Sequence, residues 1–343
     1  MIPLELAQKV LAAALRTGGD LAEIYVEDRV SLALSLEDAR LENAVRGVDR
    51  GAGVRVFFGN LVTYAYTDDL SEAALLRAAE AASAAGRGSG SARIVDLTER
   101  KSPLRFVVEK PFEHLSIAQK AALLSDADVA ARGYHPAIKQ VRAAYSELSR
   151  KVWIFNSDGV YVTDDRNFVE LRSSVIAQRD GITQRASGNF GAQGGLELLD
   201  RRSLVEEIQS AAETAIKMLD ARPAPAGEMT VVLPNGWGGV LFHEACGHQM
   251  EADFITKGQS AYAGKVGEQV AAPILSAVDD GTIAARRGSF RFDDEGTPSQ
   301  RTQLIEKGVL REYMWDLQEA RRMGGPARAT DAARASATCP CRA

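Results

Sequence analysis

Two histidines and a glutamate between His243 and His248 have the residue types that a metal-dependent hydrolase needs. Imidazole nitrogens are common zinc ligands, and a neighbouring carboxylate such as Glu244 can take a proton from a water that the metal activates. The familiar zinc helix carries its histidines at positions i and i+4, on one face. Here they are at i and i+5, which is about 140° apart on an ideal helix with 3.6 residues per turn.

Two local geometries could reconcile this spacing with a shared metal ion. A π-type wide turn returns position i+5 to roughly the same side of the helix, and such turns often occur at functional sites. Alternatively, Gly247 allows the chain to leave the helix just before His248. A purely structural interpretation is also open, because Glu244 and His248 are at i and i+4 and can form an ordinary helix-face pair.

The elements around the motif are predicted to be a short strand and a buried helix. The apolar run 229–233 predicts the strand, and Pro234-Asn235 is a helix-start signal. The helix is predicted to be buried because four of its residues are apolar: Val240, Leu241, Phe242 and Ala245.

Three further side chains close to the histidines could take part in the site. Cys246 lies between them, and we interpret it as a packing residue, with a makeshift third ligand as the alternative. Glu251 and Asp253 are candidates either for oxygen ligands or for partners that orient His243 or His248, and we favour the orienting role.

Length, charge and cysteine content narrow the class of protein. The 343 residues suggest two or three domains, and the mild net charge of -5 argues against nucleic-acid and anionic-membrane partners. Three cysteines form no disulfide framework and fit a reducing compartment. No apolar run approaches the roughly 20 residues that span a bilayer, and the N-terminus lacks a signal-peptide pattern. We therefore expect a cytoplasmic protein.

Two linker-like stretches divide the chain into three segments. The compositions of 86–91 (GRGSGS) and 222–227 (RPAPAG) are typical of flexible linkers. We predict an N-terminal α+β segment over 1–90, a middle antiparallel-sheet segment over 101–222 and a C-terminal region over 228–343.

Turn signals indicate a mixed α+β fold with antiparallel sheets and flanking helices. Gly59-Asn60, residues 156–159 and Asp180-Gly181 each separate two strand-like runs, whereas regular strand–helix alternation is absent. Residues 4–16 have the apolar spacing of a helix. Three later helices are predicted to begin at capping boxes: Asp69/Glu72, Ser116/Gln119 and Ser203/Glu206.

Other patterns favour turns and loops. The glycine-rich patch 188–195 is irregular and lacks the lysine of a phosphate loop, so a plain loop is predicted. The acidic stretches 279–281 and 293–296 are predicted to be solvated turns. Residues 305–315 predict a hairpin around Lys307-Gly308.

Five sequence blocks follow one another in order through residues 229–324: HEACGHQMEAD, GKVGEQVA, VDDGT, RRGSFRFDDEGTPSQRTQLIEKGVL and YMWDLQEARRMG. Together they resemble the TldD/PmbA family, and its TldD branch in particular. The N-terminal two-thirds resembles the same family more loosely. This many ordered blocks is far more specific than the histidine spacing alone.

The resemblance implies a cytosolic zinc peptidase that acts on unfolded or flexible peptides, which enter as an extended strand. By position, His243 and His248 would be zinc ligands, and Glu244 would be the general base for a metal-bound water whose pKa zinc lowers to about 7. The family's third ligand is a cysteine farther along than this chain reaches, so the C-terminal metallopeptidase region is expected to be incomplete. TldD-like subunits pair with a related subunit or with themselves.

The tail after about residue 325 departs from the family pattern. Residues 327–343 read ARATDAARASATCPCRA, whereas the family continues with a sequence like TGNGRRESFRHMPMPRM. Suitable synonymous codons for this tail, read two bases along, spell TGNGRRESFRHMPMPR. We therefore expect 326–343 to be an out-of-frame tail. Cys339 and Cys341 would then form no metal site, and the truncation would make peptidase activity of this chain doubtful. The nucleotide sequence that encodes the tail tests this expectation.

A function of a different class is the alternative. The chain could be a non-catalytic subunit that binds peptides or proteins, as older family names that suggest a DNA gyrase modulator imply. A binding subunit would be indifferent to chelators and to the loss of Glu244.

Overall fold

The computed structural model describes residues 1–86, 88 and 94–326. Most of the first predicted linker and nearly all of the predicted out-of-frame tail, with Cys339 and Cys341, lie outside the described residues. Among the described helices, none is long and apolar enough to cross a membrane.

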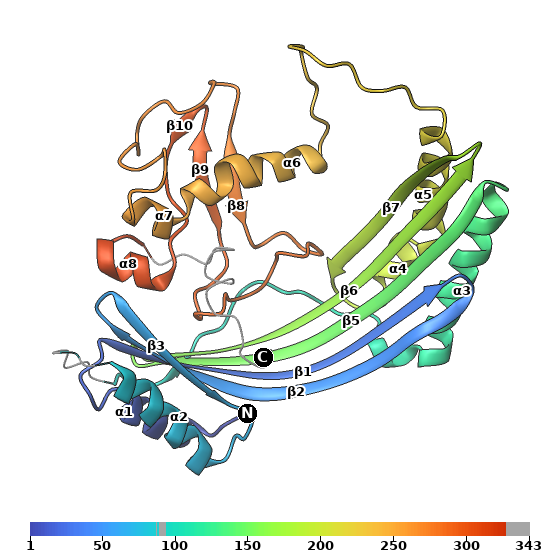
Figure 1. Cartoon of the computed structure of the whole chain (residues 1–343). Helices are drawn as coiled ribbons and strands as arrows, with labels where there is room; N and C mark the ends of the chain where they lie inside the picture. The colour runs from blue at the N-terminus through green and yellow to red at the C-terminus, as the bar shows by residue number, and fades with distance from the viewer. Residues whose placement is uncertain (87, 89–93, 327–343) are drawn as a thin grey trace.

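One long, curved sheet carries the N-terminal two-thirds of the chain (Figure 1). Its order is β3-β2-β1-β5-β6-β4, with β7 paired to β6. All neighbours are antiparallel except β4, which runs parallel to β6. This arrangement confirms the predicted α+β class with antiparallel sheets. The strands are β1 (Leu21–Glu37), β2 (Arg40–Phe58), β3 (Leu61–Thr67), β4 (Thr98–Glu99), β5 (Ile138–Asn156), β6 (Val160–Arg179) and β7 (Ile182–Gln193).

Helices cover one face of this sheet at its two ends (Figure 1). Because side chains alternate between faces along a strand, residues 22, 24 and 26 of β1 project to the same face as residues 32, 34 and 36. The first set packs in a cluster with α1 and α2, and the second packs in a cluster with α3 and α5. The helices are α1 (Leu4–Ala14), α2 (Glu72–Ala85), α3 (Ile117–Tyr134), α4 (Leu198–Arg201) and α5 (Leu204–Met218).

Two of the three predicted capping boxes are present, at the starts of α3 and α5. The box predicted from Asp69 and Glu72 is wrong. Ser71 caps α2 through its side chain, which accepts a hydrogen bond from the Ala74 N–H. Asp69 instead accepts hydrogen bonds from the backbone and hydroxyl of Ser71, so it supports the cap rather than forming it.

The C-terminal third forms a smaller unit over the concave side of the long sheet (Figure 1). A three-stranded sheet packs with short helices around an apolar cluster that includes Met250, Ile305 and Trp315. The predicted turn at Lys307-Gly308 joins β9 and β10, although β10 ends already at Leu310. The elements are α6 (Trp237–Phe242), α7 (Ala252–Thr256), β8 (Ala277–Asp280), β9 (Arg301–Glu306), β10 (Val309–Leu310) and α8 (Leu317–Met323).

Three local predictions fail because tertiary contacts decide them. Residues 229–233 belong to none of the described strands, and Val232 is 86% exposed, since no described strand lies beside this run to pair with it. The glycine-rich patch is mostly strand β7, because a side chain at Gly188 would meet Glu207 of α5, and glycine lets the helix approach. Asp279 and Asp280 end strand β8 rather than forming a turn.

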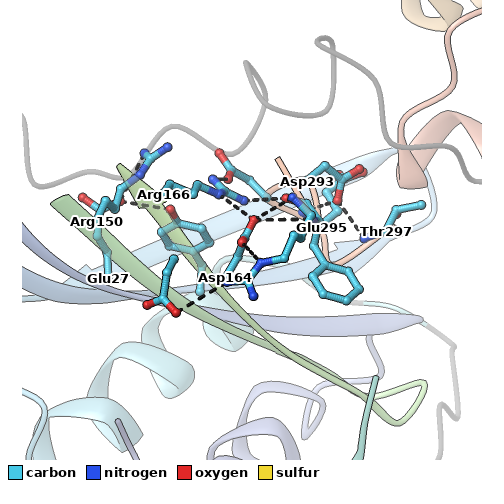
Figure 2. Close-up of polar contacts among 12 residues, drawn as sticks. Glu27, Arg150, Asp164, Arg166, Asp293, Glu295 and Thr297 are labelled. Atoms are coloured by element: carbon cyan, nitrogen blue, oxygen red, sulfur yellow. Dashed lines mark hydrogen bonds and ion pairs between the residues drawn. The ribbon is translucent and has the colours of Figure 1, made fainter. Parts of the chain in front are cut away.

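The acidic stretch 293–296 is buried at the junction of the two units, so its prediction as a solvated turn is also wrong. Figure 2 shows Arg166 of β6 pointing toward this loop. The Arg166 side chain is 1% exposed and donates hydrogen bonds to Asp164, Asp294 and the Phe292 carbonyl, the last at 2.7 Å. The loop is buried because these long-range ion pairs neutralise its charges inside the fold.

Arg55 of β2, a partly buried arginine, makes a second set of contacts with the same loop. Arg55 donates to Glu23 at 2.5 Å and to Glu295 at 2.7 Å, and Glu295 also accepts the Leu317 N–H at 2.7 Å. Burial raises the pKa of Glu295 to about 7, against the opposing effect of Arg55. Burial likewise raises the pKa of Asp293, whose Oδ2 has no hydrogen-bond partner in the described structure. We call this set the junction cluster: Glu23, Arg55, Asp164, Arg166, Arg291, Asp293, Asp294 and Glu295.

Candidate metal centre

A π-helical turn over His243–Gly247 follows α6 directly. Gly247 keeps helical dihedral angles, with φ at -57° and ψ at -58°, so the chain does not leave the helix before His248. The wide turn brings the two imidazole rings to a centroid distance of 4.4 Å. Of the two geometries that the spacing allowed, the π-type turn is therefore confirmed.

The turn gathers three possible ligand groups on one side. The ligand atoms of His243, Glu244 and His248 lie within 4.8 Å of one another, and His248 Nε2 is 3.6 Å from a Glu244 carboxylate oxygen. Two imidazoles and a carboxylate are a donor set that fits a divalent transition metal such as zinc. A catalytic zinc normally has three protein ligands, so the donor set is short of one unless Glu244 itself coordinates.

Glu251 contacts the Nδ1 atom of the His248 ring, the nitrogen that would not bind the metal. The Glu251 carboxylate lies 2.8 Å from His248 Nδ1, and this hydrogen bond is the main reason that the pKa of His248 is raised. A carboxylate on Nδ1 favours the tautomer whose Nε2 is free to bind a metal. Glu251 is held in place by the next residue, because the Ala252 N–H donates to the Met314 carbonyl at 2.8 Å.

The other two candidates point elsewhere. The carboxylate of Asp253 pairs at 2.9 Å with Lys257, which directly follows α7, rather than with a histidine. Cys246 packs against the C-terminal apolar cluster, as expected for a packing residue, and is not one of the three grouped ligands.

Cys246 also contacts Tyr262. Burial, and then a hydrogen bond with Cys246, raise the pKa of Tyr262 to about 12.

The candidate metal centre is open to solvent. His243 and Glu244 are exposed and His248 is partly exposed. The preceding helix is exposed as well: Val240 is 45% and Leu241 53% exposed, so the predicted buried helix is wrong. In the described part of the chain, the apolar face of α6 has too few neighbours to cover it. The π-helical turn therefore brings the three side chains together, and little of the surrounding protein covers them.

Comparison with protein-family models finds three ordered matches. Residues 22–86 match domain 1, residues 110–219 match the central domain, and residues 226–340 match the C-terminal domain of the PmbA/TldA metallopeptidases.

Curated relatives give a consistent result. Over 312 residues the chain is 38% identical to a Haemophilus influenzae protein named metalloprotease TldD homolog, and the match covers 89% of this chain. A protein of the same name from Buchnera aphidicola subsp. Acyrthosiphon pisum is 31% identical over 312 residues, also 89% of this chain. The chain spans 65% of the length of each of these relatives.

Solved structures with the same fold have lower sequence identity. A Thermotoga maritima protein named for modulation of a DNA gyrase superposes with a TM-score of 0.77 at 21% identity, over 94% of this chain and 73% of that one. TldE from Thermococcus kodakarensis superposes with a TM-score of 0.68 at 18% identity, over 94% of this chain and 72% of that one. At these identities the likeness concerns the fold alone.

Proposed function

The chain belongs to the PmbA/TldD metallopeptidase family, and from this premise we propose that it acts as a TldD-type zinc peptidase subunit. His243 and His248 would hold the zinc ion, and Glu244 would be the general base. The observation that carries the proposal is the π-helical turn, which gathers these three side chains within 4.8 Å. The substrates would be unfolded or flexible peptides, and the compartment the cytoplasm.

The division of work among the residues follows from their positions. Bound zinc supplies a Lewis acid that lowers the pKa of a water in its open coordination position. Glu244 is exposed and lies beside His248, so its carboxylate can accept a proton from a water on that side of the turn. Glu251 would hold the His248 ring through Nδ1, and we infer no such role for Asp253.

Two histidines in an exposed helix are a weak zinc site by themselves. We therefore expect this chain alone to bind zinc weakly and to have little peptidase activity. A third donor would come from outside the described residues, and a related family subunit is the partner that we propose. Close to one zinc per chain, together with efficient peptide hydrolysis by the chain alone, would contradict this expectation.

Zinc binding and hydrolysis by single variants test the proposal. In a competition titration with a chromophoric chelator, His243→Ala should weaken zinc binding at least tenfold, because it removes one of two imidazoles. Glu244→Gln should keep zinc but, with the related family subunit present and at saturating zinc, lower cleavage of a labelled unfolded protein by about 10²–10⁴-fold, as expected for loss of a general base.

Glu268→Gln is the matched control, since Glu268 is also exposed and its side chain makes no described hydrogen bond or ion pair. It should change neither zinc binding nor cleavage. Cleavage that survives Glu244→Gln, or zinc binding unchanged in His243→Ala, would refute the proposed roles.

A non-catalytic binding subunit is the second candidate. The open, two-histidine metal centre favours it, and solved structures of the same fold are named for modulation of DNA gyrase. In that case peptide or protein binding would persist in Glu244→Ala and in the presence of chelator, with no cleavage under any zinc concentration.

A further inference from the structure

A cavity of about 150 Å³ lies where β7 ends beside the first half of β6, and none of the three grouped metal ligands lines it. Its walls come from four parts of the chain: the segment 105–109, Asp165 and Asn167 of β6, the residues that follow from the end of β7 into α4, and Ala284-Ala285. A volume of this size holds several waters or a small organic group. The cavity is therefore large enough for a ligand.

Gln193, the last residue of β7, lines this cavity. The residue is only 4% exposed, and neither its amide nitrogen nor its amide oxygen has a hydrogen-bond partner in the described structure. Buried donors and acceptors are nearly always paired, because an unmade hydrogen bond costs the whole desolvation of the group. A carboxamide left unpaired beside a cavity therefore indicates a ligand with one donor and one acceptor.

The facing segment carries unpaired groups of its own. Residues 105–108 belong to no helix or strand, and among the described residues they form no backbone hydrogen bond. Their exposure alternates, with Phe106 and Val108 partly buried, as in a strand. The segment is fixed at its end, where the Lys110 N–H donates to Glu197 at 2.9 Å and the Lys110 carbonyl accepts from the Leu196 N–H at 2.8 Å.

The charges around the cavity do not select a charged ligand. Arg105 and Arg201 line it together with Glu109, Asp165 and Glu197, so cations and carboxylates nearly balance. Two hydrogen bonds already occupy the Glu197 carboxylate, from the backbones of Lys110 and Gly195. Recognition therefore depends on neutral donors and acceptors.

We propose that this cavity binds a peptide in extended conformation, with one peptide group hydrogen-bonded to the Gln193 carboxamide and the peptide backbone running beside residues 105–108. The NH₂ and carbonyl of a primary amide can pair with the C=O and N–H of a peptide backbone. A strand-like segment whose backbone groups are unpaired can also hydrogen-bond an extended chain, whatever the side chains of that chain are. The choice of peptide over another amide rests on the proposed function. The site would hold a part of the substrate that is not being cut.

Nuclear magnetic resonance of the side-chain amides tests the proposal directly. The ¹⁵N-labelled chain, without metal, is titrated with acetyl-tetraalanine amide, and the Gln193 signal is assigned as the one missing from Gln193→Leu. We expect the Gln193 amide signal to shift and saturate, and Gln193→Leu to weaken binding at least tenfold. An analogue with ester bonds in place of amides should bind at least tenfold more weakly.

Three further variants make the result decisive. Gln193→Glu keeps the shape of the side chain but loses the donor, so it should also weaken binding while remaining folded by circular dichroism. Gln184→Leu, on the same strand, is the matched control and should bind normally. Glu244→Gln should bind normally too, so failure of the peptidase proposal would leave this result intact.

Two outcomes would overturn the inference. An unshifted Gln193 signal at millimolar peptide would mean that water alone satisfies the carboxamide. Equal peptide affinity in Gln193→Leu and in the unchanged chain would place any binding elsewhere.

Discussion

At the π-helical turn the charged and imidazole groups face solvent, whereas in the junction cluster Arg166 and all the carboxylates are buried between the long sheet and the C-terminal unit. The turn joins residues five positions apart in one helix. The Arg166 contacts with Asp294 and the Phe292 carbonyl join residues more than a hundred positions apart. Both regions combine carboxylates with imidazole or guanidinium groups, but the groups differ in their exposure to solvent.

The difference in burial separates a site for chemistry from a site for stability. Exposed groups are screened by water, so they contribute little to folding and stay accessible to a metal and a substrate. Buried charges have lost their hydration. When one partner of a buried ion pair is removed, the other charge stays buried without either a partner or water. We therefore expect substitutions in the junction cluster to change the free energy of unfolding, and substitutions at the turn to change ligand binding.

The largest expected effect is the loss of Arg166. Arg166→Met leaves the buried carboxylates of Asp164 and Asp294 without this cation and should lower the free energy of unfolding by about 3–5 kcal/mol. Urea denaturation followed by circular dichroism measures it. Arg172→Met on the same strand removes an exposed pair with Glu170 and should cost under about 1 kcal/mol. Equal losses in the two variants would remove the contrast between buried and exposed charges.

The next effect is a pH dependence that Glu295 produces. Its folded pKa of about 7 lies above the ordinary 4.5, so the folded state binds the proton more tightly than the unfolded state. Its contribution to stability is complete below about pH 4.5 and is lost as the pH rises through 7. Relative to Glu295→Gln, the unchanged chain should lose roughly 3 kcal/mol across this range. Parallel stability curves for the two proteins would show that Glu295 titrates normally.

A smaller effect is expected where Glu251 supports the metal centre. Glu251→Gln should weaken zinc binding about 10–100-fold, because the ring of His248 loses the carboxylate that orients it. Zinc binding should also fall as the pH decreases through the raised pKa of His248, since protons compete for the ring, and this onset should move to lower pH in the variant. Asp253→Asn is the control, because the Asp253 carboxylate pairs with Lys257 and not with a histidine. Identical affinities in both variants would argue against the orienting role.

The smallest effect should be the change in stability on removing a histidine. His243→Ala alters an exposed side chain, so the free energy of unfolding without metal should change by no more than about 0.5 kcal/mol. Thermal and urea unfolding measure this change. A loss of several kcal/mol would show that the turn is part of the folded core, contrary to the comparison above.

Local features of this protein could be read from neighbouring residues. The spacing of His243 and His248 left a π-type turn as one of two geometries, and the backbone of the helix itself produces it. Capping at Ser116 and Ser203, and the turns at Gly59-Asn60 and Asp180-Gly181, also depend on residues within a few positions. Such features are predictable because the atoms that stabilise them are close in the chain.

Tertiary structure decided the features whose partners are distant. Residues 293–296 have the composition of a solvated turn and are buried only because Arg166 and Arg55 reach them from β6 and β2. One signal was present, since Asp164 and Arg166 follow the apolar Val160 and Val162 at alternate positions of β6, on the same face of the strand. The exposure of α6 and the unpaired amide of Gln193 had no signal, because burial and pairing depend on which surfaces meet, and a single segment does not contain its partner.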